Sequence, residues 1–261
     1  MTSIDRRGAL RAGVGAAVAG ALATSCTDDS PAPPPPAPPA APTPRPHGSR
    51  PGPAPAPRRF PGQPARIAHG PRDRDRVALT FHGQGDPAVA RALLAEAERA
   101  GAHVTVLAVG SWLDEYPDLA RRILDGGHDL GNHTQRHLGI SEMSATQAYA
   151  EITGCAERLR RLTGSIGTWF RPSRTRDATP LVTALAHRAG YPHVLSYDVD
   201  SLDHTKPGAT AVTRNVTGQI RRGSVVSLHF GVPDTLAALP ALLDDLNRRG
   251  LRAVTTTELL I

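Results

Sequence analysis

The sequence predicts an α/β domain built as a closed or nearly closed barrel of about seven parallel strands. Short apolar runs alternate with amphipathic helical patterns along residues 66–261, in successive β-α units. This length suits one sizeable domain and is too short for two comfortable ones. The same alternation also allows an open doubly wound sheet, which is the alternative architecture.

The first half of this domain alternates three strands with three helices. Strands are expected at 77–81, 103–109 and 128–132, and helices at 87–100, 119–124 and 144–162. Pro87 suits the first turn of the first helix, and Gly126-Gly127 ends the second. Ser144 and Gln147 have capping-box spacing at the start of the third helix.

The second half continues the pattern with four more strands. Strands are expected at 167–170, 193–196, 224–228 and 252–255, and helices at 179–188, 209–220 and 234–249. Thr179-Pro180 provides a helix start, with proline in the first turn. Because strands and helices keep alternating to the end of the chain, a parallel barrel is favoured over a sandwich.

Residues 1–26 are predicted to be an export signal rather than part of the fold. Arg6-Arg7 resembles a twin-arginine motif, and the mild apolar run that follows is too short to span a bilayer. Cys26 closes an acceptable lipobox, which predicts a lipid-anchored protein on the outer face of the membrane. A plain secretory signal cleaved near Ala23, which would release the protein, is the alternative.

Residues 27–65 are predicted to form an extended, proline-rich tether between that signal and the domain. Sixteen of the 25 prolines lie between positions 31 and 64, which favours polyproline II conformation. The net charge of +6 is also divided, with +4 in residues 1–65 and +2 in residues 66–261. No basic stripe with interleaved aromatic residues occurs, so nucleic-acid binding is disfavoured and membrane contact is expected only through the lipid.

Ionisable residues stand at or just past the ends of five predicted strands: His82, His133, Arg171, Asp198 with Asp200, and His229. In a parallel barrel the carboxyl ends of all strands meet at one mouth, where active sites form. Histidines 133 and 137 are four residues apart, a spacing that on a helical turn lets both chelate one divalent ion. Such a pair needs a third ligand.

Two other enzyme classes are disfavoured. Residues 83–88 match a G-x-G-x-x-A dinucleotide fingerprint, but Val109-Gly110-Ser111 stands where the expected acid should be. Pro87 also removes an N–H from the helix end that would cradle phosphate. A serine hydrolase is disfavoured because the chain has no G-x-S-x-G motif.

From about residue 76 to 261 the chain resembles the NodB-type polysaccharide deacetylases of carbohydrate esterase family four. Four family motifs occur in order: His133-Thr134 with His137, Phe170-Arg171-Pro172, Asp200-Ser201-Leu202-Asp203, and Ser227-Leu228-His229. The resemblance implies a distorted (β/α) barrel and a divalent metal, with zinc expected. It also implies hydrolysis of N-acetyl groups from peptidoglycan or a chitin-like glycan.

The family's first motif is altered in this chain. Thr80-Phe81 is followed by His82 and Gly83, where the family has two aspartates, the general base and the third metal ligand. Because Gly83 has no side chain to ligate, the resemblance leaves two roles open for His82. It is either the third metal ligand, beside His133 and His137, or the base.

The resemblance also implies roles for the remaining site residues. His229 is expected to protonate the departing amine, and Asp200 to support its charged form. Arg171, which pairs with the base in the family, is expected to pair with Asp86 or Asp198 instead. The retained machinery favours an active deacetylase over the alternative, a non-catalytic glycan-binding descendant of the fold. The surface anchor and tether favour peptidoglycan as the glycan.

Overall fold

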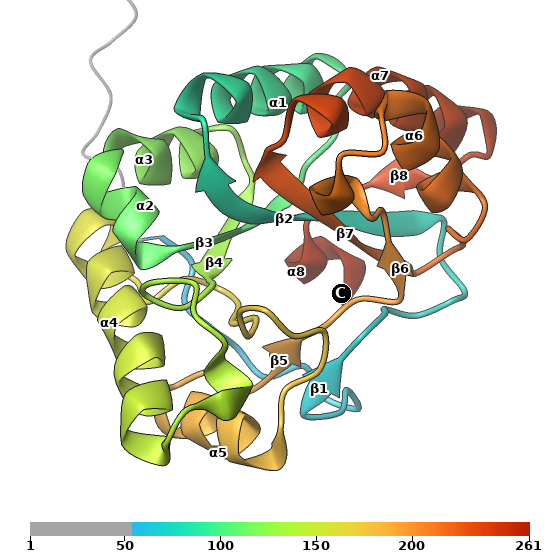
Figure 1. Ribbon diagram of the computed structural model, residues 1–261. Helices are drawn as coiled ribbons and strands as arrows, with labels where there is room; N and C mark the ends of the chain where they lie inside the picture. The colour runs from blue at the N-terminus through green and yellow to red at the C-terminus, as the bar shows by residue number, and fades with distance from the viewer. Residues whose placement is uncertain (1–53) are drawn as a thin grey trace, which may run out of the picture. The chain divides into compact units, whose positions relative to one another are not determined.

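The computed structural model describes residues 54–261 as a distorted barrel of parallel strands with helices outside it (Figure 1). The predicted export signal and most of the predicted tether lie outside these residues. The strands are β1 (Arg66–Ile67), β2 (Arg76–Gly85), β3 (Thr105–Ala108), β4 (Asp129–Asn132), β5 (Val194–Leu195), β6 (Val199–Asp200), β7 (Val225–Gly231) and β8 (Arg252–Ala253). The predicted fold class is confirmed.

The strands follow the order β4-β3-β2-β7-β6, with β8 also beside β2 and with β1 paired to β5. Every ladder between these strands is parallel. Phe170 links the two groups through single bridges to Asn132 and Val194. The strand expected at 167–170 is therefore reduced to one bridging residue, which is where the barrel is distorted.

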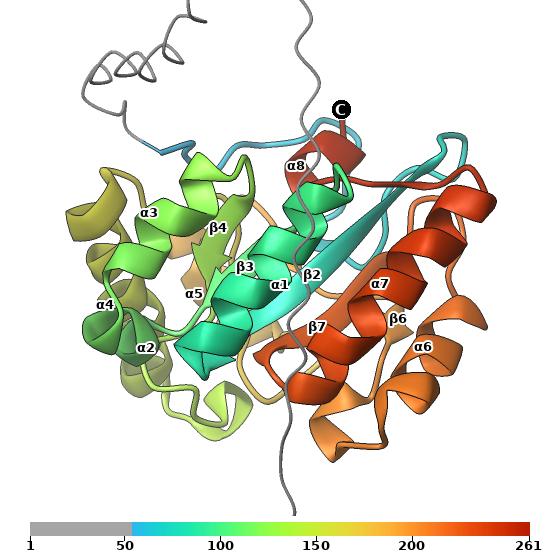
Figure 2. The same cartoon turned by 90° about the horizontal axis from the view of Figure 1, so that it is seen from above.

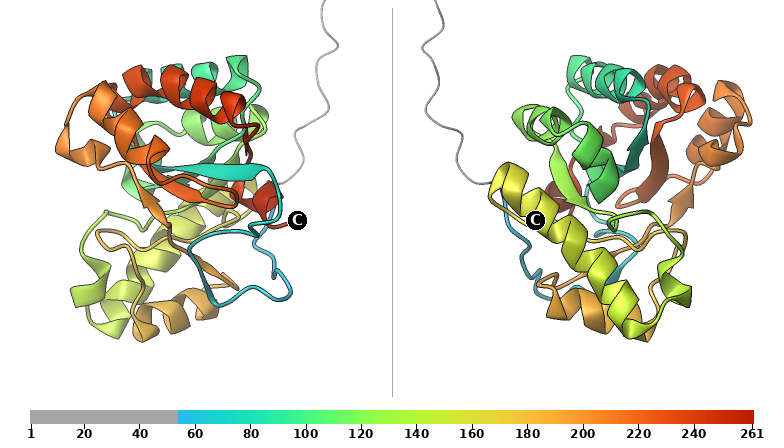
Figure 3. Two further views of the ribbon diagram at one scale, coloured as in Figure 1. Left: turned by 90° about the vertical axis from the view of Figure 1, so that its right-hand side faces the viewer. Right: turned by 60° about the vertical axis from the view of Figure 1, so that its left-hand side comes forward.

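The helices are α1 (Pro87–Arg99), α2 (Gly110–Glu115), α3 (Asp118–Asp125), α4 (Ala145–Thr163), α5 (Pro180–Arg188), α6 (Ala209–Thr217), α7 (Pro233–Arg248) and α8 (Thr256–Leu259). Figure 2 shows α3, α1, α7 and α6 in that order across the strands, and Figure 3 shows α4 on the outside of the domain near α5. The predicted capping box of Ser144 and Gln147 is confirmed at α4. No helix within the described part of the chain has the length and apolar character of a membrane span.

Apolar side chains of the strands and of the covering helices form the main core. Leu79, Phe81 and Leu228 from the central strands pack with Leu94 of α1 and Leu239 of α7, and all five are almost completely buried. Burial of such side chains is worth about 1.5–3 kcal/mol each. The outer helices therefore hold the central strands in place. The carboxyl ends of these strands carry polar residues of the site.

The chain from Ala54 to Ala65 packs on the domain, so the predicted tether boundary at residue 65 is wrong. Phe60 is 6% exposed and stacks on Trp169 with ring centroids 5.3 Å apart. His193 fixes the same segment, because its Nε2 accepts the Phe60 N–H and its Nδ1 donates to the Pro64 carbonyl. Phe60 is a single aromatic residue in a proline-rich stretch, so the average composition of the stretch does not indicate that it packs on the domain.

Candidate active site

The two histidines of the predicted metal pair lie in the loop that follows β4. His133 is fully buried, and its Nδ1 donates to the Arg171 carbonyl at 3.0 Å. The ring of His137 lies 4.9 Å away, centroid to centroid. The structure thus brings the pair together, but not on a helical turn. Thr134 and His137 have φ angles of 69° and 56°, so the loop curls through two left-handed residues.

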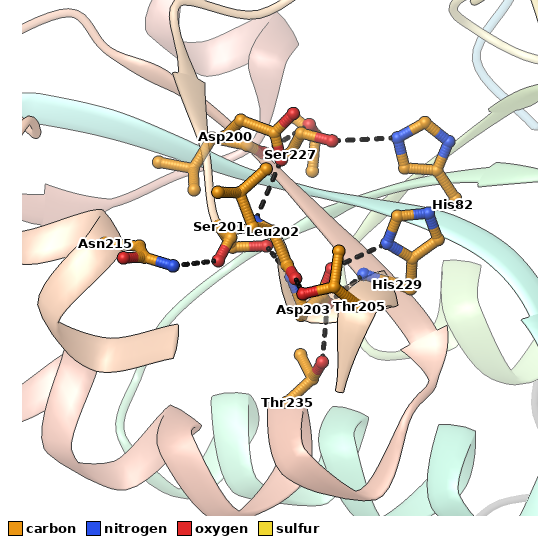
Figure 4. Close-up of polar contacts among 12 residues, drawn as sticks. His82, Asp200, Ser201, Leu202, Asp203, Thr205, Asn215, Ser227, His229 and Thr235 are labelled. Atoms are coloured by element: carbon orange, nitrogen blue, oxygen red, sulfur yellow. Dashed lines mark hydrogen bonds and ion pairs between the residues drawn. The ribbon is translucent and has the colours of Figure 1, made fainter. Parts of the chain in front are cut away.

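His82, near the carboxyl end of β2, completes a cluster of three imidazoles. Its Nδ1 lies 2.7 Å from Nε2 of His133, and one nitrogen from each ring of His82, His133 and His137 lies within 4.8 Å of the others. Nε2 of His82 lies 2.9 Å from Oγ of Ser227 in β7 (Figure 4). The predicted metal pair and His82, the candidate third ligand, are therefore adjacent in space.

The hydrogen bond to the Arg171 carbonyl turns the lone pair of His133 toward His82. A carbonyl can only accept, so Nδ1 of His133 carries the proton and Nε2 carries the lone pair. The Ser227 hydroxyl can donate to or accept from Nε2 of His82, so it allows either tautomer of that ring. At 2.7 Å, Nδ1–H of His82 can donate to Nε2 of His133, and loss of that proton would free both lone pairs for a cation. A carbonyl that fixes the tautomer, as at His133, is a usual support of metal-binding histidines.

Electrostatics keeps all three rings neutral near pH 7. Burial, reinforced by neighbouring imidazoles and Arg171, holds the pKa values of His82 and His133 well below the ordinary value. Burial and then the charge of Arg174 lower the pKa of His137 to about 4. Because imidazole ligates metals only in its neutral form, the three-histidine cluster fits a divalent cation such as zinc.

His229 lies next to this cluster on the neighbouring strand and is held by a buried carboxylate. It pairs with His82 in the β2–β7 ladder, and the two rings stack with centroids 4.5 Å apart. Its Nδ1 and backbone N–H each lie 2.7 Å from a carboxylate oxygen of Asp203, which also accepts from Thr235 (Figure 4). Burial alone would raise the pKa of Asp203, but the bonds from His229 and Thr235 outweigh it and hold that pKa low. Asp203 therefore stays charged and keeps a proton on Nδ1 of His229.

A cavity of about 440 Å³ opens over these groups. Its walls include His82, His137, His204, His229, Tyr197, Asp200, Arg174 and Arg176. The surrounding loops contain all five non-glycine residues of the described chain with positive φ: Thr134, His137, Arg174, Leu202 and Lys206. Backbone strain of this kind concentrates at functional sites. Trp112 and Trp169 are buried, whereas Tyr197 lines this cavity.

Comparison with known proteins matches this geometry to one family. Residues 69–194 match the family model described as polysaccharide deacetylase. A peptidoglycan-N-acetylglucosamine deacetylase of Bacillus cereus is 32% identical over 190 residues, which cover 70% of this chain and 87% of that protein. The chain belongs to the polysaccharide deacetylase family.

Solved structures share the fold of this polysaccharide deacetylase. The Bc1960 peptidoglycan N-acetylglucosamine deacetylase superposes with a TM-score of 0.70 at 25% identity, covering 75% of this chain and 92% of that chain. A CE4 family pseudoenzyme from Bacillus anthracis superposes with a TM-score of 0.72, covering 76% and 70% of the two chains, and at 22% identity shows the fold alone. A Listeria monocytogenes relative, 28% identical over 184 residues and 70% of this chain, is matched over 38% of its own length.

The position of the family's missing metal-ligating aspartate is closed by backbone. A Cβ added to Gly83 would lie 2.9 Å from both Cα of Ala108 and Cγ1 of Val106 in β3. Contacts this short require the backbone of β3 to move. No side chain fits at position 83 as the strands now pack, and His82 is the residue of β2 that reaches the cluster.

Arg171 does not form the ion pair that the sequence predicts. It is fully buried, and its Nη2 donates to Thr80 and to the Ser196 carbonyl, while Nη1 has no hydrogen-bond partner. Burial lowers the pKa of Arg171 to about 9. Both expected partners are occupied elsewhere, since Asp198 pairs with Arg72 and Asp86 caps α1.

Asp200 is the second predicted site residue whose contacts differ from expectation. The sequence predicts that Asp200 supports His229, but Asp203 makes those contacts. Asp200 instead accepts from the Tyr197 hydroxyl and the Leu202 N–H. The fourth motif contains two carboxylates three residues apart. The left-handed backbone of Leu202 turns the chain between them, so that Asp203 contacts His229.

Proposed function

We propose that this polysaccharide deacetylase is a metal-dependent hydrolase that removes N-acetyl groups from a cell-wall glycan, with peptidoglycan favoured over chitin. One observation carries the proposal: three neutral imidazoles lie beside the His229–Asp203 pair at one cavity. The names of relatives point the same way, since they include peptidoglycan-N-acetylglucosamine deacetylases and a chitooligosaccharide deacetylase.

The residues divide into a metal-binding set and a proton-holding set. His82, His133 and His137 would hold the divalent cation, and zinc suits three imidazole ligands with an open fourth position. When bound, the cation supplies Lewis acidity toward the acetamide carbonyl. His229 would hold the proton that passes from Nε2 to the departing amine, with Asp203 fixing the ring. Hydrolysis consumes one water and yields acetate and a free amine.

The alternative is a non-catalytic glycan-binding protein, favoured by the loss of both family aspartates at His82 and Gly83. The two candidates differ in metal content and in chemistry. If the enzyme is active, the full-length protein should hold one divalent ion per chain and release acetate from N-acetylated peptidoglycan fragments. Chelation should abolish acetate release and added zinc should restore it. Glycan binding with neither stoichiometric metal nor acetate release would establish the alternative.

We further propose that the protein acts outside the cytoplasm, tethered through Cys26 at the end of the export signal. The sequence supports this through the lipobox at Ala23–Cys26. Cys26→Ala should shift the protein from the membrane fraction to the medium, because lipidation requires the thiol, while the thermal melting of the domain stays unchanged. Unaltered membrane fractionation of that variant would disprove the anchor.

A further inference from the structure

Two arginines line the cavity without a carboxylate partner. Arg174 and Arg176 come from the segment that follows Phe170, and both side chains are exposed to the cavity. Within residues 54–261 neither guanidinium forms an ion pair, whereas Arg66, Arg72 and Arg136 do. Their positive charge is therefore open to a ligand.

Arg176 is held in place at the cavity, and Arg174 also lies in its wall. Arg176 donates from Nε to the Tyr197 carbonyl at 3.2 Å, and its guanidinium lies over the Tyr197 ring, 5.2 Å from the centroid. Arg174 has a left-handed backbone with φ of 54°. After burial, its charge is the next cause that lowers the pKa of His137. A strained backbone is retained where surrounding structure imposes it, as at ligand-binding loops.

The cavity contains little negative charge to balance these arginines. Asp200 is the one carboxylate among its walls, and that group already accepts from Tyr197 and Leu202. Asp203 is buried beneath His229, and Asp177, close by in sequence, pairs with Arg66. The two aspartates that the family places at positions 82 and 83 are absent. The site is therefore positive even before a cation binds.

We propose that Arg174 and Arg176 form a subsite for a carboxylate carried by the N-acetylated sugar substrate. This inference rests on the proposed function for its choice of a sugar ligand. Guanidinium groups match carboxylates in shape and charge, and such bonds are about twice as strong as neutral ones. The carboxylate can come from two sources, an acidic ether group on the acetylated sugar itself or a neighbouring uronic acid.

Calorimetric titration of the metal-free, full-length protein tests this subsite directly. Metal-free protein is used because a bound cation would itself attract a carboxylate. The probes are N-acetylglucosamine, N-acetylmuramic acid, and a disaccharide of N-acetylglucosamine with glucuronic acid. At least one acidic probe should bind about tenfold more tightly than the neutral sugar, and the preference should shrink as salt is raised. Whichever acidic probe binds tighter identifies the source of the carboxylate.

Charge-removing variants then assign the preference to these two side chains. Arg174→Gln, Arg176→Gln and the double variant should reduce the ratio of acidic to neutral affinity, with the double variant bringing it close to one. Arg188→Gln is the matched control, since Arg188 is exposed on α5 and lies over Tyr149, outside the cavity. Equal affinity for all probes in the unmodified protein, or an undiminished preference in the double variant, overturns the subsite.

The same titration separates this proposal from the proposed function. Acetate release is measured independently on zinc-loaded protein. A carboxylate preference without acetate release would leave the subsite standing and defeat the hydrolase. Acetate release without any carboxylate preference would support the hydrolase and overturn the subsite.

Discussion

Asp203→Asn is expected to lower the kcat of acetamide hydrolysis by about 10²–10⁴-fold, the usual contribution of a positioned acid–base group. Asp203 is buried and accepts from both Nδ1 and the backbone N–H of His229. Asparagine keeps the shape of the side chain but loses the charge that stabilises protonated imidazole and orients its ring. The measurement is kcat on an N-acetylated glycan fragment, with thermal melting as the check on folding.

Asp200→Asn is the matched comparison, because both carboxylates belong to one motif. Asp200 contacts Tyr197 and Leu202 and makes no bond to His229. Its replacement should therefore cost less than about tenfold in kcat, well short of the loss expected for an acid–base partner. If Asp200→Asn proves as damaging as Asp203→Asn, the assignment of the orienting carboxylate to Asp203 alone is wrong.

The strand ends could be predicted from the sequence because the relevant signals are local. A short apolar run followed by an ionisable residue places that residue at the mouth of a parallel barrel. His82, His133 and His229 all follow this rule, and the structure places them on β2, after β4 and on β7. Capping residues such as Ser144 work in the same way, since their partners lie only a few positions away.

The partners of Arg171 and His229 could not be predicted because they depend on contacts distant in sequence. The sequence offered Asp86 and Asp198 to Arg171, but a helix cap and Arg72 bind them. It assigned Asp200 to His229, whereas the left-handed turn at Leu202 brings Asp203 there instead. Neither local sequence pattern nor composition indicates which partner each side chain binds.

Gly83 changes how the altered first motif can be tested. The backbone conformation does not oppose restoring both family aspartates, since φ at Gly83 is not in the left-handed region. A Cβ at this position would nevertheless press on the backbone of Ala108 at 2.9 Å. Gly83→Asp would thus disturb β3, where the Ala108 carbonyl accepts the backbone N–H of His133. The informative substitutions are therefore at His82.

His82→Ala is expected to weaken zinc binding as strongly as His133→Ala or His137→Ala, by more than about 100-fold. Loss of a hydrogen-bond partner behind a ligand already costs about 10–100-fold in affinity, and loss of the ligand itself should cost more. Three imidazoles hold zinc well, whereas two hold it poorly. The measurement is the zinc dissociation constant of each full-length variant, obtained by competition with a chelator.

Ser227→Ala is the matched comparison for this prediction. Ser227 contacts Nε2 of His82 and does not belong to the three-histidine cluster. It should weaken zinc binding by the smaller factor of about 10–100-fold. If His82 is instead the general base, His82→Ala should keep its zinc and lose about 10²–10⁴-fold in rate. The grouping of His82 with His133 and His137, one nitrogen of each ring lying within 4.8 Å of the others, favours the ligand role. Full zinc occupancy in His82→Ala would exclude that role, and full activity there would exclude both.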